Sequence, residues 1–234
     1  MRFFAIAAIG LLPSACADSQ ERQLPNLAEE GFFYDCVALG DALCDGDVQR
    51  DLFDTDDSTP SGIPIPARIA VGSLFTIEYF DRVEGQLTRR PVDAATDYFI
   101  EETGEEFTAL RAGVTTLLAR DARGSVSEVL HLEFSEPAEV QIDGAESGLS
   151  TGENIDLFAE VFDSERRRLG GALTYTWTVA DPTVLRLTPA YDNGPDALSD
   201  DHVIIETVAI GVTDVTVRVG ELSVTTTIRV GGDV

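Results

Sequence analysis

Hydrophobic and polar residues alternate with a period of two along most of the chain after residue 68, and this pattern constrains the fold more than any other feature. One run is apolar at every second position, at Ile155, Leu157, Ala159 and Val161. Residues 173–179 and 222–230 continue the theme with many β-branched side chains. Successive side chains of a β-strand point to opposite faces of a sheet, so this period indicates half-buried strands. The pattern predicts an all-β fold.

Turn residues divide these runs into short strands, and the two halves of the chain resemble each other. Residues 108–115 line up with residues 206–213, 98 positions later. Short strands with regular turn signals are typical of a sandwich or barrel, and self-similarity indicates tandem copies of one unit. Pro137 cannot donate a ladder hydrogen bond and suits a junction. We therefore predict two domains, over 66–135 and 136–234.

The N-terminus has the composition of an export signal. Arg2 precedes an apolar run of ten residues, Phe3 to Leu12. That run is too short to span a bilayer but suits the core of a signal peptide. We predict a signal peptide over residues 1–15, with an ordinary secretory cleavage near Ala15 or Ala17 as the alternative.

The residues Pro13-Ser14-Ala15-Cys16 resemble the lipobox of bacterial lipoproteins, with proline where that family usually has leucine. The resemblance implies that Cys16 is acylated and becomes the mature N-terminus. In that family, Ala17 after the cysteine favours the outer membrane. Either mode of cleavage exports the protein to the cell envelope.

An acidic segment follows, and we interpret residues 16–65 as a tether. It holds 12 acidic residues and two arginines. Cys36 and Cys44 are close in sequence, and in an oxidising compartment such a pair predicts a disulfide loop. Residues 32–34 are Phe-Phe-Tyr, too apolar for a linker, and we expect them to pack onto the first domain.

The chain as a whole is strongly acidic, with 42 acidic and 16 basic residues and a formal net charge of −26. Such a surface repels phosphate backbones, which argues against nucleic-acid binding. It is compatible with divalent cations or basic partners. The only basic run is 166–168, which we expect to form a solvated hairpin that an acidic partner or polysaccharide could contact.

Candidate chemical groups are few. We expect His131 to face solvent from a strand, and His202 follows an acidic loop. No hydrolase, P-loop or metalloprotease motif occurs, so we predict no enzyme and no cofactor. The run from Asp45 departs from a calcium-binding EF-hand, because Arg50 occupies the position that needs glycine. The remaining cation candidates, for calcium, are four acids in the loop 190–201: Asp192, Asp196, Asp200 and Asp201.

The second half resembles bacterial immunoglobulin-like domains of the BIG2 type. The matching segments, in order, are Leu149–Glu153, Val161–Asp163, Thr176–Thr178, Asp181–Val184, Ala209–Thr213 and Ile228–Val230. The resemblance implies a core tryptophan, Trp177, on the third strand and a close approach at Gly211. The loop 190–201 is longer than the family pattern, and residues 68–134 look like a diverged relative.

We therefore expect two tandem immunoglobulin-like β-sandwich domains after an acidic N-terminal tether. The family implies extracellular spacers, stalks or adhesive units. The expected function is that of a non-enzymatic cell-envelope lipoprotein, acting as a spacer or as an adhesion or interaction module. Its partner would be an envelope protein or polysaccharide. The alternative is a calcium- or carbohydrate-binding adhesin that uses the loop 190–201.

Overall fold

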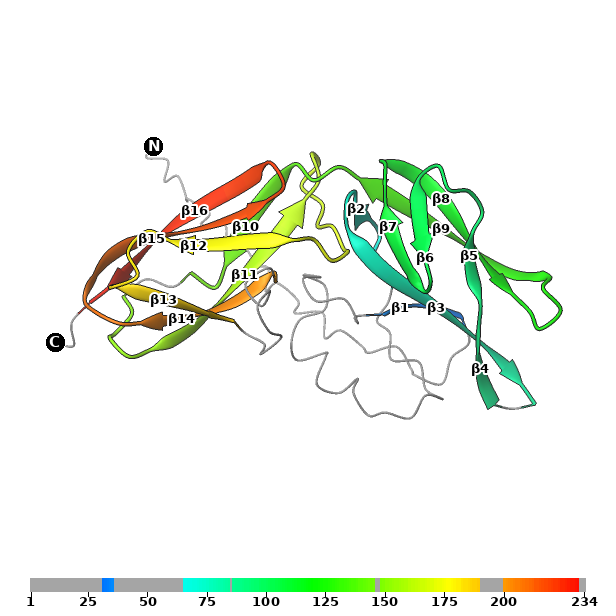
Figure 1. Cartoon of the computed structure of the whole chain (residues 1–234), viewed down its shortest axis with the longest axis horizontal. Coiled ribbons are helices and arrows are strands. Elements are labelled where there is room, and N and C mark those ends of the chain that lie inside the picture. Colours follow the sequence, from blue (N-terminus) through cyan, green and yellow to red (C-terminus); the bar gives the residue numbers. More distant parts are fainter. Residues whose placement is uncertain (1–30, 36–64, 85, 146–147, 190–199, 232–234) are drawn as a thin grey trace, which may run out of the picture.

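The computed structural model describes residues 31–35, 65–84, 86–145, 148–189 and 200–231. Every regular element in this part of the chain is a β-strand, so the all-β prediction is confirmed. Figure 1 shows two β-sandwiches arranged end to end. We call them domain 1, which contains strands β1–β9, and domain 2, which contains strands β10–β16.

Domain 2 has two antiparallel sheets that face each other. The first has the order β10 (Glu139–Asp143), β11 (Asn154–Phe162), β14 (His202–Thr207), β13 (Leu185–Pro189). The second has the order β12 (Tyr175–Val179), β15 (Gly211–Val219), β16 (Leu222–Val230). This is the strand order of a seven-stranded immunoglobulin constant-type sandwich.

The core of domain 2 forms around Trp177, the predicted anchor on the third strand. Its side chain is 4% exposed and lies among apolar residues of both sheets. Gly211 begins β15 where the chain passes close to Val184. A Cβ on Gly211 would lie 2.7 Å from the Val184 Cγ2 atom, so the predicted close approach is also confirmed.

Domain 1 repeats this arrangement. One sheet has the order β1 (Gly31–Asp35), β3 (Leu74–Val83), β7 (Glu106–Ala109), β6 (Ile100–Thr103), with β4 (Gln86–Arg90) pairing the far end of β3. The other has the order β2 (Ile69–Ala70), β9 (Val126–Ser135), β8 (Gly113–Arg120), β5 (Val92–Ala94). The hydrogen bond from Gly72 N to Ala109 O (2.7 Å) has its counterpart in domain 2 from Gly152 N to Thr207 O (2.8 Å). The internal repeat is therefore present in the structure as well as in the sequence.

Strand β1 corrects the predicted boundary between tether and domain. It lies inside the segment interpreted as a tether, yet it pairs with β3 along its whole length. Tyr34 is fully buried in the domain 1 core, and Phe32 packs on Tyr79 with ring centroids 4.8 Å apart. The expected packing of these aromatics is confirmed, and β1 takes the position that β10 has in domain 2. Residues 36–64, which lie outside the described part, therefore connect two strands of one domain.

Candidate interaction site

The contact between the two domains is made by backbone hydrogen bonds as well as side chains. Ala70 N donates to Gly170 O (2.8 Å), and Gly170 N donates to Arg68 O (2.9 Å). Leu74 and Ala172 exchange a second pair, of 2.9 and 2.7 Å. The chain at the starts of β2 and β3 in domain 1 is thus paired with the loop between β11 and β12 of domain 2. We call these contacts the junction.

The junction also has a packed interior. Ala70, although it belongs to β2, lies in the hydrophobic cluster of domain 2. Gly171 is buried with φ +98°, and a Cβ at this position would overlap the Ser73 side chain and lie 3.2 Å from Ile69 Cγ2. Glycine adopts this conformation without the strain that a side chain would bring. The close approach of the two domains therefore depends on a glycine here.

Asp163 organises the loop on the domain 2 side of the junction. Its carboxylate accepts hydrogen bonds from the Glu165 amide (2.9 Å), the Arg167 amide (2.9 Å) and the Arg167 Nε (2.8 Å). Burial raises the pKa of Asp163, but the hydrogen bonds and charge of Arg167 outweigh burial and hold the pKa below its usual value. Arg68 of domain 1 lies 3.8 Å from the same carboxylate and 2.8 Å from Glu133. This cluster joins charges from both domains.

The run 166–168 lies in a hairpin, as expected, closed by a bridge between Phe162 and Arg168, and the Arg166 side chain is exposed, but the arginines are paired with acids. Arg166 is 3.5 Å from Glu139, Arg167 binds Asp163, and Arg168 is 3.1 Å from Glu160. Each guanidinium therefore has an acidic neighbour within the same domain. The run stabilises its own loop and is less available to an acidic partner than the sequence suggests.

A cavity of about 380 Å³ lies between the domains beside the junction. Its apolar wall comes from Val71 of domain 1, from Pro137 in the linker, and from Leu173 and Leu222 of domain 2. All four side chains are half-buried. The cavity lining is mainly apolar, and Glu221 contributes a carboxylate to it.

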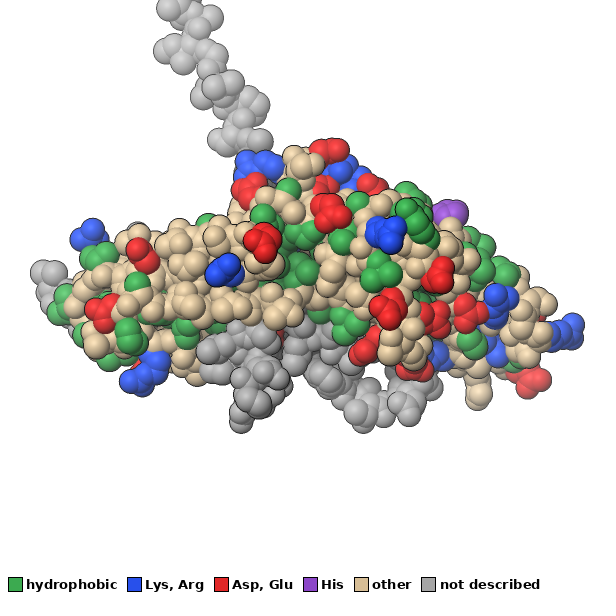
Figure 2. Space-filling view, turned by 45° about the horizontal axis from the view of Figure 1, so that its top comes forward, with side chains coloured by type: hydrophobic (Ala, Val, Ile, Leu, Met, Phe, Trp, Pro, Cys, Tyr) green, Lys and Arg blue, Asp and Glu red, His purple; other side chains and the backbone are tan. Residues whose placement is uncertain are grey.

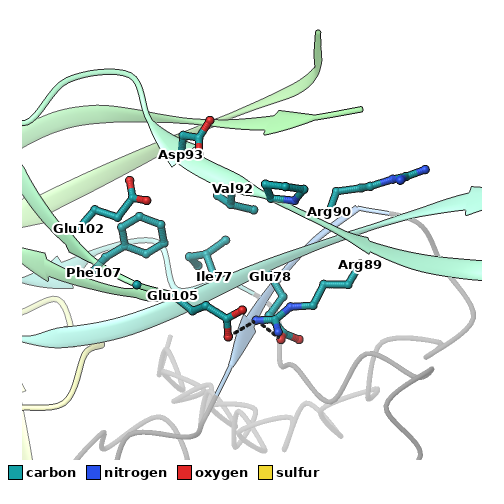
Figure 3. A pocket seen from close by; sticks show the side chains of 11 residues that line it. Ile77, Glu78, Arg89, Arg90, Val92, Asp93, Glu102, Glu105 and Phe107 are labelled. Atoms are coloured by element: carbon teal, nitrogen blue, oxygen red, sulfur yellow. Dashed lines mark hydrogen bonds and ion pairs between the residues drawn. The ribbon is translucent and has the colours of Figure 1, made fainter. Parts of the chain in front are cut away.

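A second cavity, of about 350 Å³, opens between the sheets of domain 1 (Figure 3). Ile77 and Phe107 contribute apolar side chains to its lining. At its rim the Arg89 guanidinium lies 2.8 Å from Glu78 and 3.1 Å from Glu105. Since two carboxylates neutralise this arginine, the rim does not present a free positive charge to an anion.

The acidic candidates from the loop 190–201 divide into two groups. Asp192 and Asp196 lie outside the described residues. Asp200 and Asp201 are 6% and 8% exposed, so they are not the solvated loop acids that the sequence suggests. The Asp200 carbonyl accepts a hydrogen bond from Trp177 Nε1 (2.8 Å), and its carboxylate accepts one from the Asp201 amide (2.9 Å). Asp200 therefore anchors the end of the loop to the core.

Both histidines occupy strands. His131 is exposed, as predicted, and its Nδ1 is 3.0 Å from the Thr116 hydroxyl. His202 begins β14, where its Nε2 lies 2.8 Å from Asp156 and its ring stacks on Phe158 at 4.2 Å. His202 thus has a partner other than Asp200 and Asp201.

Within the described ranges, no three His, Cys, Asp or Glu side chains gather in a way that could hold a metal ion. Likewise, this part of the chain contains no helix long and apolar enough to cross a membrane. Cys16, Cys36 and Cys44 lie outside the described residues. Lipidation, the disulfide and the calcium hypothesis therefore stay predictions.

The outer face of β12, β15 and β16 is rich in hydroxyl groups and poor in acids. Its exposed or half-buried polar side chains are Thr176, Thr178, Asp214, Thr216, Arg218, Ser223, Thr225, Thr227 and Arg229. Thr178 pairs with Thr216, which pairs with Thr225 in the same row. In Figure 2 the visible surface of domain 2, on the left, has few charged side chains, whereas acids gather on domain 1. We call the outer face of β12, β15 and β16 the hydroxyl face.

Sequence reasoning found neither the junction nor the hydroxyl face. In the sequence, the adjacent glycines Gly170 and Gly171 indicate a turn, although a close approach of two backbones is another reason for such a pair. In the sequence, the alternating threonines predict strands only. Their common face became visible once the register of β12, β15 and β16 was known.

The strand order defines the class of this protein as a tandem immunoglobulin-like β-sandwich protein. No family model and no curated protein matches the sequence, so the BIG2 assignment stays a prediction.

Solved structures match this chain only at low similarity. The S-layer protein rSbsC matches with a TM-score of 0.34 and 11% identity, over 76% of this chain and 25% of that one. The Yersinia pseudotuberculosis adhesin InvE matches with a TM-score of 0.35 and 13% identity, over 71% of this chain and 57% of that one. A β-glycosidase from Bacteroides vulgatus matches with a TM-score of 0.34 and 16% identity, over 71% of this chain and 23% of that one. Similarity at this level carries no function to the chain.

Proposed function

We propose that this protein is a non-enzymatic cell-envelope lipoprotein whose two sandwiches act together as a spacer and interaction module. The observation that carries the proposal is the junction. Backbone hydrogen bonds pair Ala70 and Leu74 of domain 1 with Gly170 and Ala172 of domain 2. Relative motion is the usual expectation for domains joined by a small polar contact. Here the paired backbones and the packed Ala70 favour a fixed, elongated unit.

The anchor in this proposal is Cys16. An acyl-modified cysteine carrying more than one chain gives durable membrane attachment, whereas a single chain gives only reversible binding. Because β1 begins at Gly31, the segment available as a tether is residues 16–30. Fifteen residues reach at most roughly 50 Å when fully extended. Domain 1 would therefore stand closer to the membrane than a tether of the predicted length implies.

Cell fractionation tests the anchor. Cys16→Ser should move the full chain from the membrane fraction to the soluble fraction, because no acyl group can be attached. Cys36→Ser is the matched control, since it removes a cysteine without removing the proposed acylation site, and it should stay in the membrane fraction. Retention of Cys16→Ser in membranes would contradict the lipoprotein proposal. Labelling with an alkyne-bearing fatty acid gives a second readout of the same modification.

A further inference from the structure

The cavity of domain 1 lies where the first sheet is interrupted. Strand β7 pairs with residues 74–76 of β3, and β4 pairs with residues 79–83. Ile77 and Glu78 therefore have no strand partner on that side within the described part of the chain. This interruption coincides with the opening of about 350 Å³ between the two sheets, and both residues contribute to its lining.

Apolar side chains form the inner part of the cavity. Phe107 faces the space between the sheets and is 1% exposed. Ile77 lies two positions beyond Phe75, the residue opposite Phe107, so Ile77 and Phe107 point to the same side of their sheet. Val92 contributes from β5 of the other sheet, and Pro91 precedes it. An apolar group placed here would be removed from water on several sides.

Glu102 places a carboxylate at the mouth of the cavity. It lies on β6, the edge strand of the sheet, directly opposite Phe107 in the register. Opposite residues of an antiparallel pair have their side chains on the same face, so Glu102 is on the side that faces the cavity (Figure 3). The side chain is exposed, and the polar contact that it makes with the described residues is with the Ala94 amide, at 3.4 Å.

The other charged groups around the cavity are already paired. Arg89 lies 2.8 Å from one glutamate and 3.1 Å from another, and Arg90 lies 2.8 Å from Asp81. Asp93 pairs with an arginine of β8. Among the described residues, Glu102 is therefore the charged group of the lining that has no opposite charge beside it. The cavity combines an apolar interior with one unpaired negative charge.

We propose that this cavity binds a small organic cation, in which an ammonium group is carried on a short apolar chain. The ammonium group would lie at Glu102. The apolar chain would lie against Ile77, Val92 and Phe107. Small-molecule sites have volumes of about 300 to 1,000 Å³ and combine an apolar lining with a few polar groups, and this cavity lies at the lower end of that range. An anion would meet the Glu102 carboxylate with no unpaired arginine of the lining to offset it.

A matched set of ligands tests the chemistry of the site in the full-length protein. Hexylamine, hexanol and hexanoate share an alkyl chain and differ in charge, whereas ethylamine keeps the charge and shortens the chain. Calorimetry or ligand-observed NMR should show hexylamine binding about fivefold more tightly than hexanol, and hexanoate binding most weakly. Ethylamine should bind about tenfold more weakly than hexylamine, because it buries fewer methylene groups.

The amide of N-acetyl-lysine identifies the source of the ammonium group. It carries the same ammonium on the same kind of alkyl chain, attached to a peptide backbone. Binding tighter than that of hexylamine would assign the site to a lysine side chain of a polypeptide. Weaker binding would assign it to a free amine.

Substitutions in the full-length protein test the residues. Glu102→Gln should weaken hexylamine binding about fivefold and leave hexanol binding unchanged, because it removes the charge and keeps the shape. Glu101→Gln is the matched control, since it changes the net charge equally but its side chain points to the opposite face of β6. Val92→Phe should fill the cavity and abolish binding of both ligands, and circular dichroism checks that it is folded. Glu102→Gln, at an exposed edge position, decides the question even if Val92→Phe does not fold.

The proposal is overturned if hexylamine does not bind in the millimolar range, or if hexanoate binds as tightly. It is also overturned if Glu101→Gln weakens hexylamine binding as much as Glu102→Gln does, because attraction to a chain of net charge −26 would then explain the binding. None of these results bears on membrane anchoring through Cys16, so failure here is distinct from failure of the proposed function.

Discussion

Gly171 of domain 2 lies against Ser73 of domain 1 so closely that a Cβ on Gly171 would overlap the Ser73 side chain. The contact lies within the backbone pairing of the junction, and Gly171 has φ +98°. One residue without a side chain therefore sets how closely the two sandwiches approach.

Gly171→Ala should loosen the junction. The variant combines a strained φ with a steric overlap, and we expect the free energy of unfolding to fall by about 2 kcal/mol. Small-angle scattering should show a broader distribution of shapes than the parent. Gly152→Ala is the matched control, because its φ is +88° but nothing lies within 4 Å of the added Cβ. If both variants scatter alike, the junction does not depend on Gly171.

Asp163 should make the junction sensitive to acid. Because its folded pKa is below its unfolded value, Asp163 stabilises the protein above the unfolded pKa of about 3.9. That contribution is lost as pH falls from there through the lower folded pKa. Asp163→Asn should be less stable at neutral pH and should lose less stability on acidification. Denaturant unfolding at several pH values measures this, and Asp121→Asn should keep the acid-dependent loss because Asp163 remains.

Tyr79 should titrate late. Burial is the main cause that raises its pKa to about 12, with the hydrogen bond to Glu128 and the charge of Glu128 adding to it. Between pH 10 and about 12 the unfolded tyrosine ionises before the folded one, so its stabilising contribution is present below pH 10 and is lost through that range. Phenolate absorbance should show this late step in the parent and lack it in Tyr79→Phe. A titration identical in both would contradict the assignment.

Trp177→Phe should destabilise domain 2. The substitution removes the hydrogen bond to the Asp200 carbonyl and leaves a gap in a core position that is 4% exposed. We expect a loss of about 2 kcal/mol in denaturant unfolding followed by circular dichroism. Tyr98→Phe, at an aromatic that is 56% exposed, should change stability by much less. A loss as small as that of the control would mean that Asp200 is held by other contacts.

The alternation of apolar and polar residues determined the strands and their inward faces. The buried positions of β11, Leu157, Ala159 and Val161, are those that the period of two assigns to one face. The repeat of 98 residues likewise matches Gly113 and Gly211, which begin β8 and β15. These features are local, because a side chain's face follows from its place along the strand.

Only the tertiary structure decided which strands meet. Residues 31–35 pair with residues 76–80, far along the chain, and a short aromatic run does not encode its partner. Asp200 is buried although it lies in an acidic stretch, and its backbone carbonyl accepts the hydrogen bond of the Trp177 indole, a contact that no local pattern predicts. The contact of Gly171 with Ser73 arises from the packing of two domains. Contacts between residues far apart in sequence depend on how the whole chain buries its apolar surface. A local sequence pattern does not determine this.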